Sequence, residues 1–157
     1  MANRLYGMTG FSPNLMAGAT LSVETQGEGF VEITRDVAAF LHQAGAGDGV
    51  LLAYIRHTSA SLVIQENADP DVQTDLVTAL GRLAPANAGW VHDAEGPDDM
   101  PAHIKAMING VSLHVPVSGG ELALGTWQGI YLAEHRTRAH RRDILLQFIG
   151  RALIQSM

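Results

Sequence analysis

The sequence contains no cysteine among its 157 residues. The protein therefore has no disulfide, no thiolate nucleophile and no sulfur ligand for zinc. Any metal ion must be held by histidine, aspartate, glutamate or backbone oxygen. The Walker, Rossmann, zincin and nucleophile-elbow motifs are absent as well, so no common catalytic signature identifies the protein.

Charged residues are also scarce, at 17% of the chain, whereas hydrophobic residues make up 46%. This is little charge for a soluble monomer, and it suggests that apolar surface is buried between subunits. The net charge of -6 indicates an acidic surface that repels polyanions. We therefore expect no nucleic-acid partner.

Long apolar runs are missing too. The longest, residues 50–55, is far too short to cross a bilayer. Residues 1–16 contain glycine, proline and asparagine and no sustained apolar run, which predicts neither a signal peptide nor an anchor. We expect a cytoplasmic protein without a membrane partner.

Hydrophobic periodicity predicts a single compact α+β domain over residues 19–157, preceded by an N-terminal extension at residues 1–18. We expect a mixed, largely antiparallel sheet with two main helices and one short helix. Residues 50–55 are apolar on both faces, which is typical of a strand that is covered on both sides. The expected strands are residues 19–24, 30–33, 50–55, 61–64, 111–117, 122–132 and 144–149.

Capping residues mark the helices. Thr34 is the expected N-cap of a helix that ends at Gly45, and Asp69 followed by Pro70 begins a helix that continues to Leu83. The short helix is expected at residues 101–109. Between them, residues 84–101 form a long loop without periodicity, and such loops are usually functional or mobile.

The histidines are the first candidates for chemistry. His57, His92 and His103 occur beside breaks in the predicted elements, where side chains can converge at one end of a sheet. Neutral imidazole suits zinc and similar transition metals. The alternative for each is a surface or hydrogen-bonded core histidine. The segment at residues 93–99, which is rich in carboxylates, lies between His92 and His103. Its carboxylates would either hydrogen-bond to the imidazoles or form a solvated loop.

Two carboxylates are candidates for proton transfer. Glu66 would act as a general base near a metal ion, and Asp93 would relay a proton. Glu66 could equally place favourable charge at the N-terminus of the helix that begins at Pro70. Trp127, between two glycines, is expected to be a core residue, although a close backbone approach to a ligand is the alternative.

An arginine cluster follows in an otherwise acidic chain. Arg136, Arg138 and Arg141 are candidates for binding phosphate, since guanidinium groups hold phosphate or carboxylate bidentately. The alternative is a salt-bridged loop or a subunit contact. Beside the cluster, His135 is a fourth histidine candidate for the site.

Several segments, taken together, resemble the YjbQ family, also called the secondary thiamine-phosphate synthase family. The resemblance covers the chain from about residue 20 to its C-terminus. At residues 99–103 this chain reads DMPAH, where relatives commonly have Asn-Ala-x-Ala-His. The matching segments are residues 57–61 (HTSAS), 66–71 (ENADPD), 90–92 (WVH), 102–105 (AHIK), 115–117 (VPV), 120–122 (GEL) and 124–128 (LGTWQ).

The resemblance implies a homotrimer of single α+β domains, with a metal ion held by His57, His92 and His103. It also implies a thiamine-phosphate synthase activity, in which a pyrimidine diphosphate joins a thiazole phosphate and pyrophosphate is released. Histidine ligands favour zinc or a related metal, whereas pyrophosphate departure is usually assisted by Mg²⁺.

Three hypotheses follow. The first is a transferase in which the arginines, with Thr58 and Ser59, bind phosphate and Glu66 is the acid or base. The second is a metal-dependent hydrolase of a small phosphorylated or anionic substrate, with Glu66 or Asp93 relaying the proton. The third is a metal- or ligand-binding protein without turnover.

Overall fold

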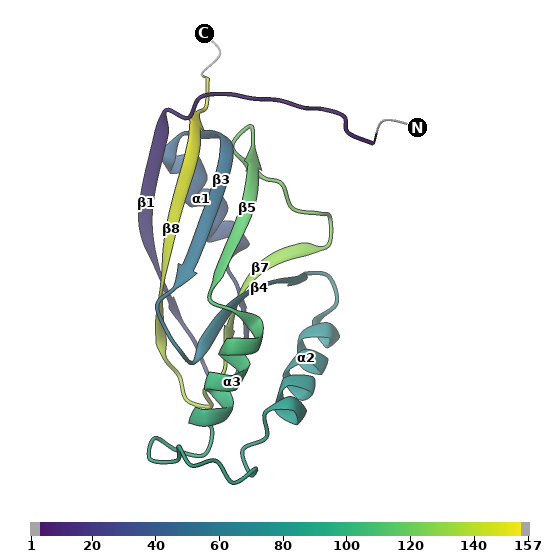
Figure 1. Cartoon of the computed structure of the whole chain (residues 1–157), viewed down its shortest axis with the longest axis vertical. Helices are drawn as coiled ribbons and strands as arrows, with labels where there is room; N and C mark the ends of the chain where they lie inside the picture. The colour runs from purple at the N-terminus through teal and green to yellow at the C-terminus, as the bar shows by residue number, and fades with distance from the viewer. Residues whose placement is uncertain (1–3, 155–157) are drawn as a thin grey trace.

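The computed structural model describes residues 4–154, and its largest element is an antiparallel sheet with the strand order β1-β8-β3-β5-β6 (Figure 1). β1 begins at Leu15, earlier than predicted, so part of the expected N-terminal extension is an edge strand of this sheet. The first three residues of that extension lie outside the described residues. The strands are β1 (Leu15–Glu24), β3 (Ala46–Ile55), β5 (Ser112–Ser118), β6 (Glu121–Leu122) and β8 (Arg141–Ala152).

A second, smaller antiparallel sheet has the order β2-β7-β4. The elements β2 (Gly29–Glu32), β4 (Ala60–Glu66) and β7 (Gln128–Glu134) form it. β7 begins only at Gln128, because the expected strand at 122–132 is interrupted by a loop. Trp127 lies in that loop and is 64% exposed, so the prediction of a core tryptophan was wrong.

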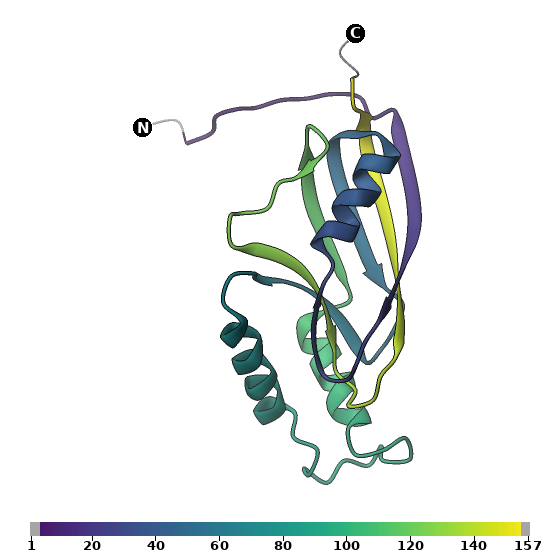
Figure 2. The same ribbon diagram turned by 180° about the vertical axis from the view of Figure 1, so that it is seen from behind.

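Helix α1 (Thr34–Ala44) covers one face of the larger sheet (Figure 2). Val37 and Leu41 are its buried residues, and Gly45 ends the helix in the left-handed conformation, with φ of 66°. Thr34 is not the N-cap. Its hydroxyl donates to Glu32 and accepts from the backbone N–H of Ile130, so it ties the helix to the smaller sheet.

The other two helices pack beside the smaller sheet. α2 (Pro70–Leu83) begins as predicted, with the Asp69 side chain accepting from the backbone N–H of Asp71, but none of its residues is fully buried. α3 (Asp99–Asn109) starts slightly earlier than expected and is as long as α1, at 11 residues. Its side chains Ala102 and Ala106 pack inward. Among the described residues, no helix is long and apolar enough to span a membrane.

The core lies between the inner faces of the two sheets and α1, and the fold is the expected single compact α+β domain. Leu51, Ala53 and Ile55 of β3 point into this core and are almost fully buried. Tyr54, on the opposite face of β3, is 43% exposed. The prediction that both faces of this strand are covered is therefore wrong for the single chain.

Candidate metal centre

Three side chains converge where the long loop meets α3. Asp99 and His103 lie four residues apart on α3 and share one face of the helix, while His92 comes from the loop. The Oδ2 atom of Asp99 lies 2.7 Å from Nε2 of His92 and 3.3 Å from Nε2 of His103. One ligand atom from each residue lies within 4.8 Å of the others.

The other oxygen of Asp99 is held by Arg136. Nη1 of Arg136 donates to Oδ1 of Asp99, Nε donates to Asp98 at 3.0 Å, and Nη2 donates to the carbonyl of Glu95 at 2.9 Å. The side chain of Arg136 is only 8% exposed. Asp98 also accepts from the backbone N–H of Thr137. Arg136 therefore fixes the orientation of the Asp99 carboxylate.

The electrostatics keep Asp99 ionised. Burial raises its pKa, but the hydrogen bond from His92 and the charge of Arg136 lower it more, and the net pKa lies below the ordinary value. Asp98 behaves in the same way, since its hydrogen bonds from Thr137 and Arg136 outweigh burial and lower its pKa. At neutral pH the centre thus offers a carboxylate rather than a carboxylic acid.

The hydrogen bonding of His103 indicates that the centre binds a cation. Nδ1 of His103 lies 3.0 Å from the carbonyl oxygen of Thr58, and only a protonated nitrogen can donate to that oxygen. In a neutral ring, Nε2 then presents its lone pair to the Asp99 carboxylate. Two electron-rich atoms in this arrangement need a cation between them, either a proton or a metal ion.

The set of donor atoms fits a metal ion. Two imidazole nitrogens and one carboxylate oxygen are common ligands of zinc, and three protein ligands leave a further position for substrate or water. The backbone carbonyl behind His103 and the guanidinium behind Asp99 are the supporting contacts that metal ligands usually have. Asp99 was not predicted as a ligand. Its spacing of four residues from His103 was the signal that could have identified it.

His57 does not belong to this group. Its Nε2 accepts from the backbone N–H of Asp143 at 3.1 Å. Burial, followed by the charge of Arg142, lowers the pKa of His57. The structure therefore brings together two of the three predicted histidines, and His57 lies beside the centre, one residue from the carbonyl that holds His103.

An open cavity of about 560 Å³ adjoins the centre at Thr58. It contains the predicted phosphate-binding residues Thr58 and Ser59 together with His57. Arg56, an exposed cation, also lines the cavity. It was not predicted from the sequence, because it lies just before the HTSAS segment and outside that motif. The lining residues are Tyr54, Ile55, Arg56, His57, Thr58, Ser59 and Val111.

The arginine cluster is divided by the fold. Arg136 is held by Asp98 and Asp99, which corresponds to the salt-bridged alternative rather than to a phosphate site. Arg142 is similarly buried and donates to Glu134 and to Ser59. Arg138 and Arg141 are exposed, and Arg141 donates to the hydroxyl of Ser22 at 3.1 Å. Of the predicted arginines, only these exposed two are accessible to a ligand.

The predicted acid and base residues lie at different distances from the centre. Asp93 is exposed and directly follows His92. Glu66 pairs with Gln128 at the far end of β4, whereas Ala60, at the end close to Thr58, pairs with Glu134. Six residues of strand span about 20 Å. Within one chain, Glu66 is therefore remote from the metal centre, and the expected catalytic role does not fit the geometry.

His135 is a hydrogen-bonded core histidine. Its Nε2 lies 2.7 Å from the hydroxyl of Ser61, and both side chains are buried. Burial, followed by the charge of Lys105, lowers the pKa of His135 to about 4. The ring is therefore neutral at physiological pH and serves the packing between β4 and β7.

Comparison with known proteins finds consistent similarity. The family model described as "UPF0047 protein YjbQ-like" matches residues 19–151. The UPF0047 protein sll1880 of Synechocystis sp. is 44% identical over 131 residues, which cover 83% of this chain and 89% of the relative. The UPF0047 protein YjbQ of Salmonella typhimurium is 42% identical over 132 residues, covering 83% and 96% of the two chains.

Solved structures show the same fold. A YjbQ/UPF0047 family protein of Clostridium acetobutylicum superimposes with a TM-score of 0.76 at 34% identity, covering 83% of this chain and 98% of that one. A protein of unknown function from Sulfolobus solfataricus has a TM-score of 0.77 at 25% identity, with coverage of 86% and 99%. The region that the family model matches, residues 19–151, contains all three residues of the candidate centre.

Proposed function

The chain belongs to the YjbQ-like UPF0047 family, and we propose that it is a metal-dependent enzyme that acts on a small phosphorylated molecule. The observation that carries the proposal is the convergence of His92, Asp99 and His103, in which Nδ1 of His103 donates to the carbonyl of Thr58 and Nε2 lies 3.3 Å from Asp99. A cavity that contains Arg56 reaches these residues at Thr58, whose carbonyl oxygen accepts from His103.

A divalent ion, zinc or a similar transition metal, bound by His92, His103 and Asp99 would supply a Lewis acid for a phosphate oxygen. Mg²⁺ remains an alternative when a diphosphate substrate provides oxygen ligands of its own. The imidazole donors favour zinc over Mg²⁺ in the protein alone.

The residues of the cavity would hold the anionic substrate. Arg56 offers a guanidinium, and Thr58 offers a hydroxyl, to phosphate oxygens. Because Nε2 of His57 accepts from Asp143, the proton of its neutral ring is on Nδ1, which is then the donor that His57 can offer. Exposed Arg138 and Arg141 would attract the anion toward this end of the molecule.

The first reaction we propose is the thiamine-phosphate synthase-like transfer that the family resemblance implies. The bond between the pyrimidine methylene carbon and the diphosphate oxygen breaks, and pyrophosphate leaves with the electron pair. The thiazole nitrogen forms the new carbon–nitrogen bond. The chain would contribute by orienting both phosphate-bearing substrates and by stabilising the leaving anion.

Hydrolysis is the second candidate, and the ligand set favours it. Two histidines with one carboxylate are the protein ligands of several zinc hydrolases. Asp93 is exposed and directly follows His92, and in this proposal it would accept a proton from the attacking water. The two reactions share the phosphate-binding cavity and differ in the nucleophile.

A direct assay tests the proposal. Metal-loaded protein is incubated with the pyrimidine diphosphate and the thiazole phosphate, and separately with a generic phosphate monoester, and products are quantified by chromatography. Thiamine phosphate with pyrophosphate identifies the transferase, and released phosphate identifies the hydrolase. Asp99→Asn is expected to abolish either activity. Metal binding without any turnover would contradict the enzyme proposal and leave a binding protein.

A further inference from the structure

The chain before β1 forms an arm, residues 4–13, that has no helix or strand and extends away from the body at one end of the larger sheet (Figure 1). Tyr6 and Met8 of the arm are each 94% exposed. The family match begins only at residue 19, so the arm lies outside it. Large apolar side chains that are close together and exposed usually mark an interaction site.

The root of the arm is firmly attached to the sheet. The backbone N–H of Asn14 donates to Gly150, and its side-chain oxygen accepts from the N–H of Ala152, both at 2.8 Å. The ring of Phe11 lies 5.1 Å from the guanidinium carbon of Arg151. These contacts direct the arm across the end of the strands (Figure 1), and the exposed side chains of Tyr6 and Met8 lie beyond them.

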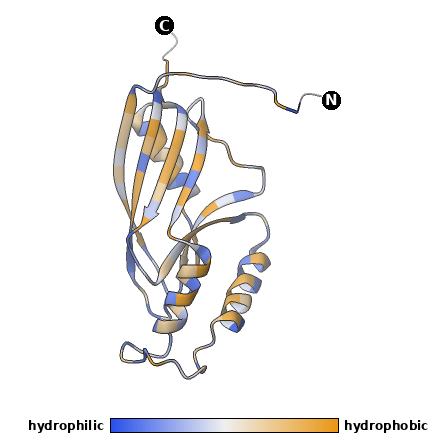
Figure 3. Ribbon diagram, in the orientation of Figure 1, coloured by the Kyte–Doolittle hydropathy of each residue, from blue (hydrophilic) through white to orange (hydrophobic). Residues whose placement is uncertain are grey.

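The larger sheet has an open apolar face opposite α1. Figures 1 and 2 show α1 on one face, and no described helix or strand covers the other. Figure 3 shows hydrophobic residues distributed along the strands of this sheet. The outward residues of β3 include Leu52 and Tyr54, which are the positions that the sequence pattern assigned to a covered strand.

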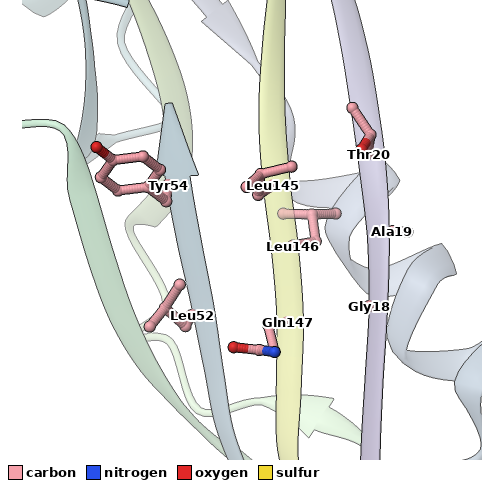
Figure 4. A pocket seen from close by; sticks show the side chains of 8 residues that line it. All are labelled: Gly18, Ala19, Thr20, Leu52, Tyr54, Leu145, Leu146 and Gln147. Carbon is pink, nitrogen blue, oxygen red and sulfur yellow. The ribbon is translucent and has the colours of Figure 1, made fainter. Parts of the chain in front are cut away.

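Small residues of β1 make a hollow in this face. Gly18, Ala19 and Thr20 stand beside the larger side chains of β3 and β8, as Figure 4 shows. The hollow has a volume of about 540 Å³, which is enough for one or two large side chains. It is lined by Gly18, Ala19, Thr20, Leu52, Tyr54, Leu145, Leu146 and Gln147.

We propose that the arm of one copy of this chain docks on the open sheet face of a second copy, with Tyr6 and Met8 in the hollow beside Thr20. Ten extended residues span about 33 Å, which is enough to cross a neighbouring molecule. To enter the hollow of its own chain, the arm would have to reverse direction at the root fixed by Phe11 and Asn14.

The charge of the arm also supports docking on a second copy of the chain. Arg4 is the only charged residue among residues 4–13, whereas the whole chain carries a net charge of -6. A cationic arm is therefore attracted to the acidic body of another copy. One buried tyrosine contributes only about 150–250 Å², whereas a stable interface buries more than about 1,000 Å². A closed ring, such as the homotrimer expected from the family resemblance, would give each copy one donated and one received arm.

Site-specific cross-linking tests the contact, because the chain has no cysteine of its own. Protein carrying Gly7→Cys, which keeps both Tyr6 and Met8, is mixed with differently tagged protein carrying Thr20→Cys and mildly oxidised. We expect mixed disulfides at least about tenfold more abundant than with Leu83→Cys protein, since docking raises the effective thiol concentration. Leu83 is exposed on α2, far along the chain from both partners.

A double variant, Gly7→Cys with Thr20→Cys on one chain, distinguishes the alternatives. A disulfide within single chains, without mixed disulfides between copies, would show that the arm folds back and would overturn the proposal. Mixed disulfides no more abundant than those of the Leu83→Cys control would overturn it as well.

The assembly itself gives a second readout. Light scattering during size-exclusion chromatography is expected to show a loss of assembly, or a dissociation constant raised at least about tenfold, for Tyr6→Ser with Met8→Ser. Leu83→Ser removes another exposed apolar side chain, 66% exposed, and is expected to leave the mass unchanged. An unchanged mass for the arm variant at all concentrations would contradict the proposal.

Discussion

Arg136 donates to Oδ1 of Asp99 and thereby leaves Oδ2 facing the two histidines of the candidate metal centre. This contact joins the segment after β7 to the first residue of α3. The arginine that the sequence suggested for phosphate binding instead positions a metal ligand. Several outcomes of mutation follow from this arrangement.

Replacing Arg136 should weaken both the fold and the centre. Arg136→Met leaves the buried carboxylate of Asp99 and the partly buried carboxylate of Asp98 without their partner, and loss of one member of a buried ion pair costs about 3–5 kcal/mol. Loss of a supporting contact lowers metal affinity about 10–100-fold. Urea unfolding and metal titration measure the two effects.

Arg138→Met is the matched control for this variant. Arg138 is exposed and lies two residues along the chain, so its replacement should change stability by no more than about 0.5 kcal/mol. Equal losses of stability in the two variants would show that Arg136 behaves as an ordinary surface arginine. The buried ion pair with Asp99 would then be contradicted.

His135 should make stability depend on pH. Its pKa is about 4 in the folded protein and 6.5 when unperturbed, so the unfolded chain binds more protons between these values. Stability contributed by this neutral histidine is therefore complete above pH 6.5 and is lost as the pH falls toward 4. From about pH 7 to about pH 5 the loss should be about 2 kcal/mol.

The variant His135→Gln isolates this contribution, because it keeps a polar side chain for Ser61 and cannot be protonated. Urea unfolding as a function of pH is expected to give a shallower slope for the variant than for the wild type. Identical slopes would mean that His135 titrates normally in the folded state.

Glu66 should be dispensable for metal binding in a single chain. It lies at the far end of β4, so Glu66→Gln is expected to leave the metal affinity unchanged. Asp99→Asn, by contrast, removes a ligand charge and should lower the affinity more than about tenfold. Competition with a chromophoric chelator compares the two. A comparable loss for Glu66→Gln would indicate that Glu66 reaches the centre, for instance from a neighbouring copy.

Much of the fold could be predicted from local patterns. α2 begins at Pro70 after the Asp69 cap because those residues have strong positional preferences, and Gly45 ends α1 for the same reason. Trp127 was misplaced because flanking glycines are compatible with both a packed strand and an exposed loop. The open face of β3 could not be predicted. Apolar residues on both faces of a strand indicate that both faces are buried, but they do not indicate whether the same chain or a partner chain buries them.

The candidate site was only partly predictable. His92 and His103 were identified, but His57 was grouped with them because sequence position does not fix which way a ring nitrogen points. Asp99 was read as part of an acidic loop, and its role depends on Arg136, which comes from a distant segment. Contacts of this kind form only when distant segments fold together, so the spacing of residues along the sequence does not predict them.

Metal content tests the central claim most directly. Elemental mass spectrometry is performed on untagged wild type and on His92→Ala, His103→Ala, His57→Ala and His42→Ala, after circular dichroism has confirmed that each folds. We predict near-stoichiometric transition metal in the wild type and in His42→Ala, retention in His57→Ala, and loss in His92→Ala and His103→Ala. Well-folded wild type that binds no metal after reconstitution, or metal retained in both of the latter variants, would contradict the account.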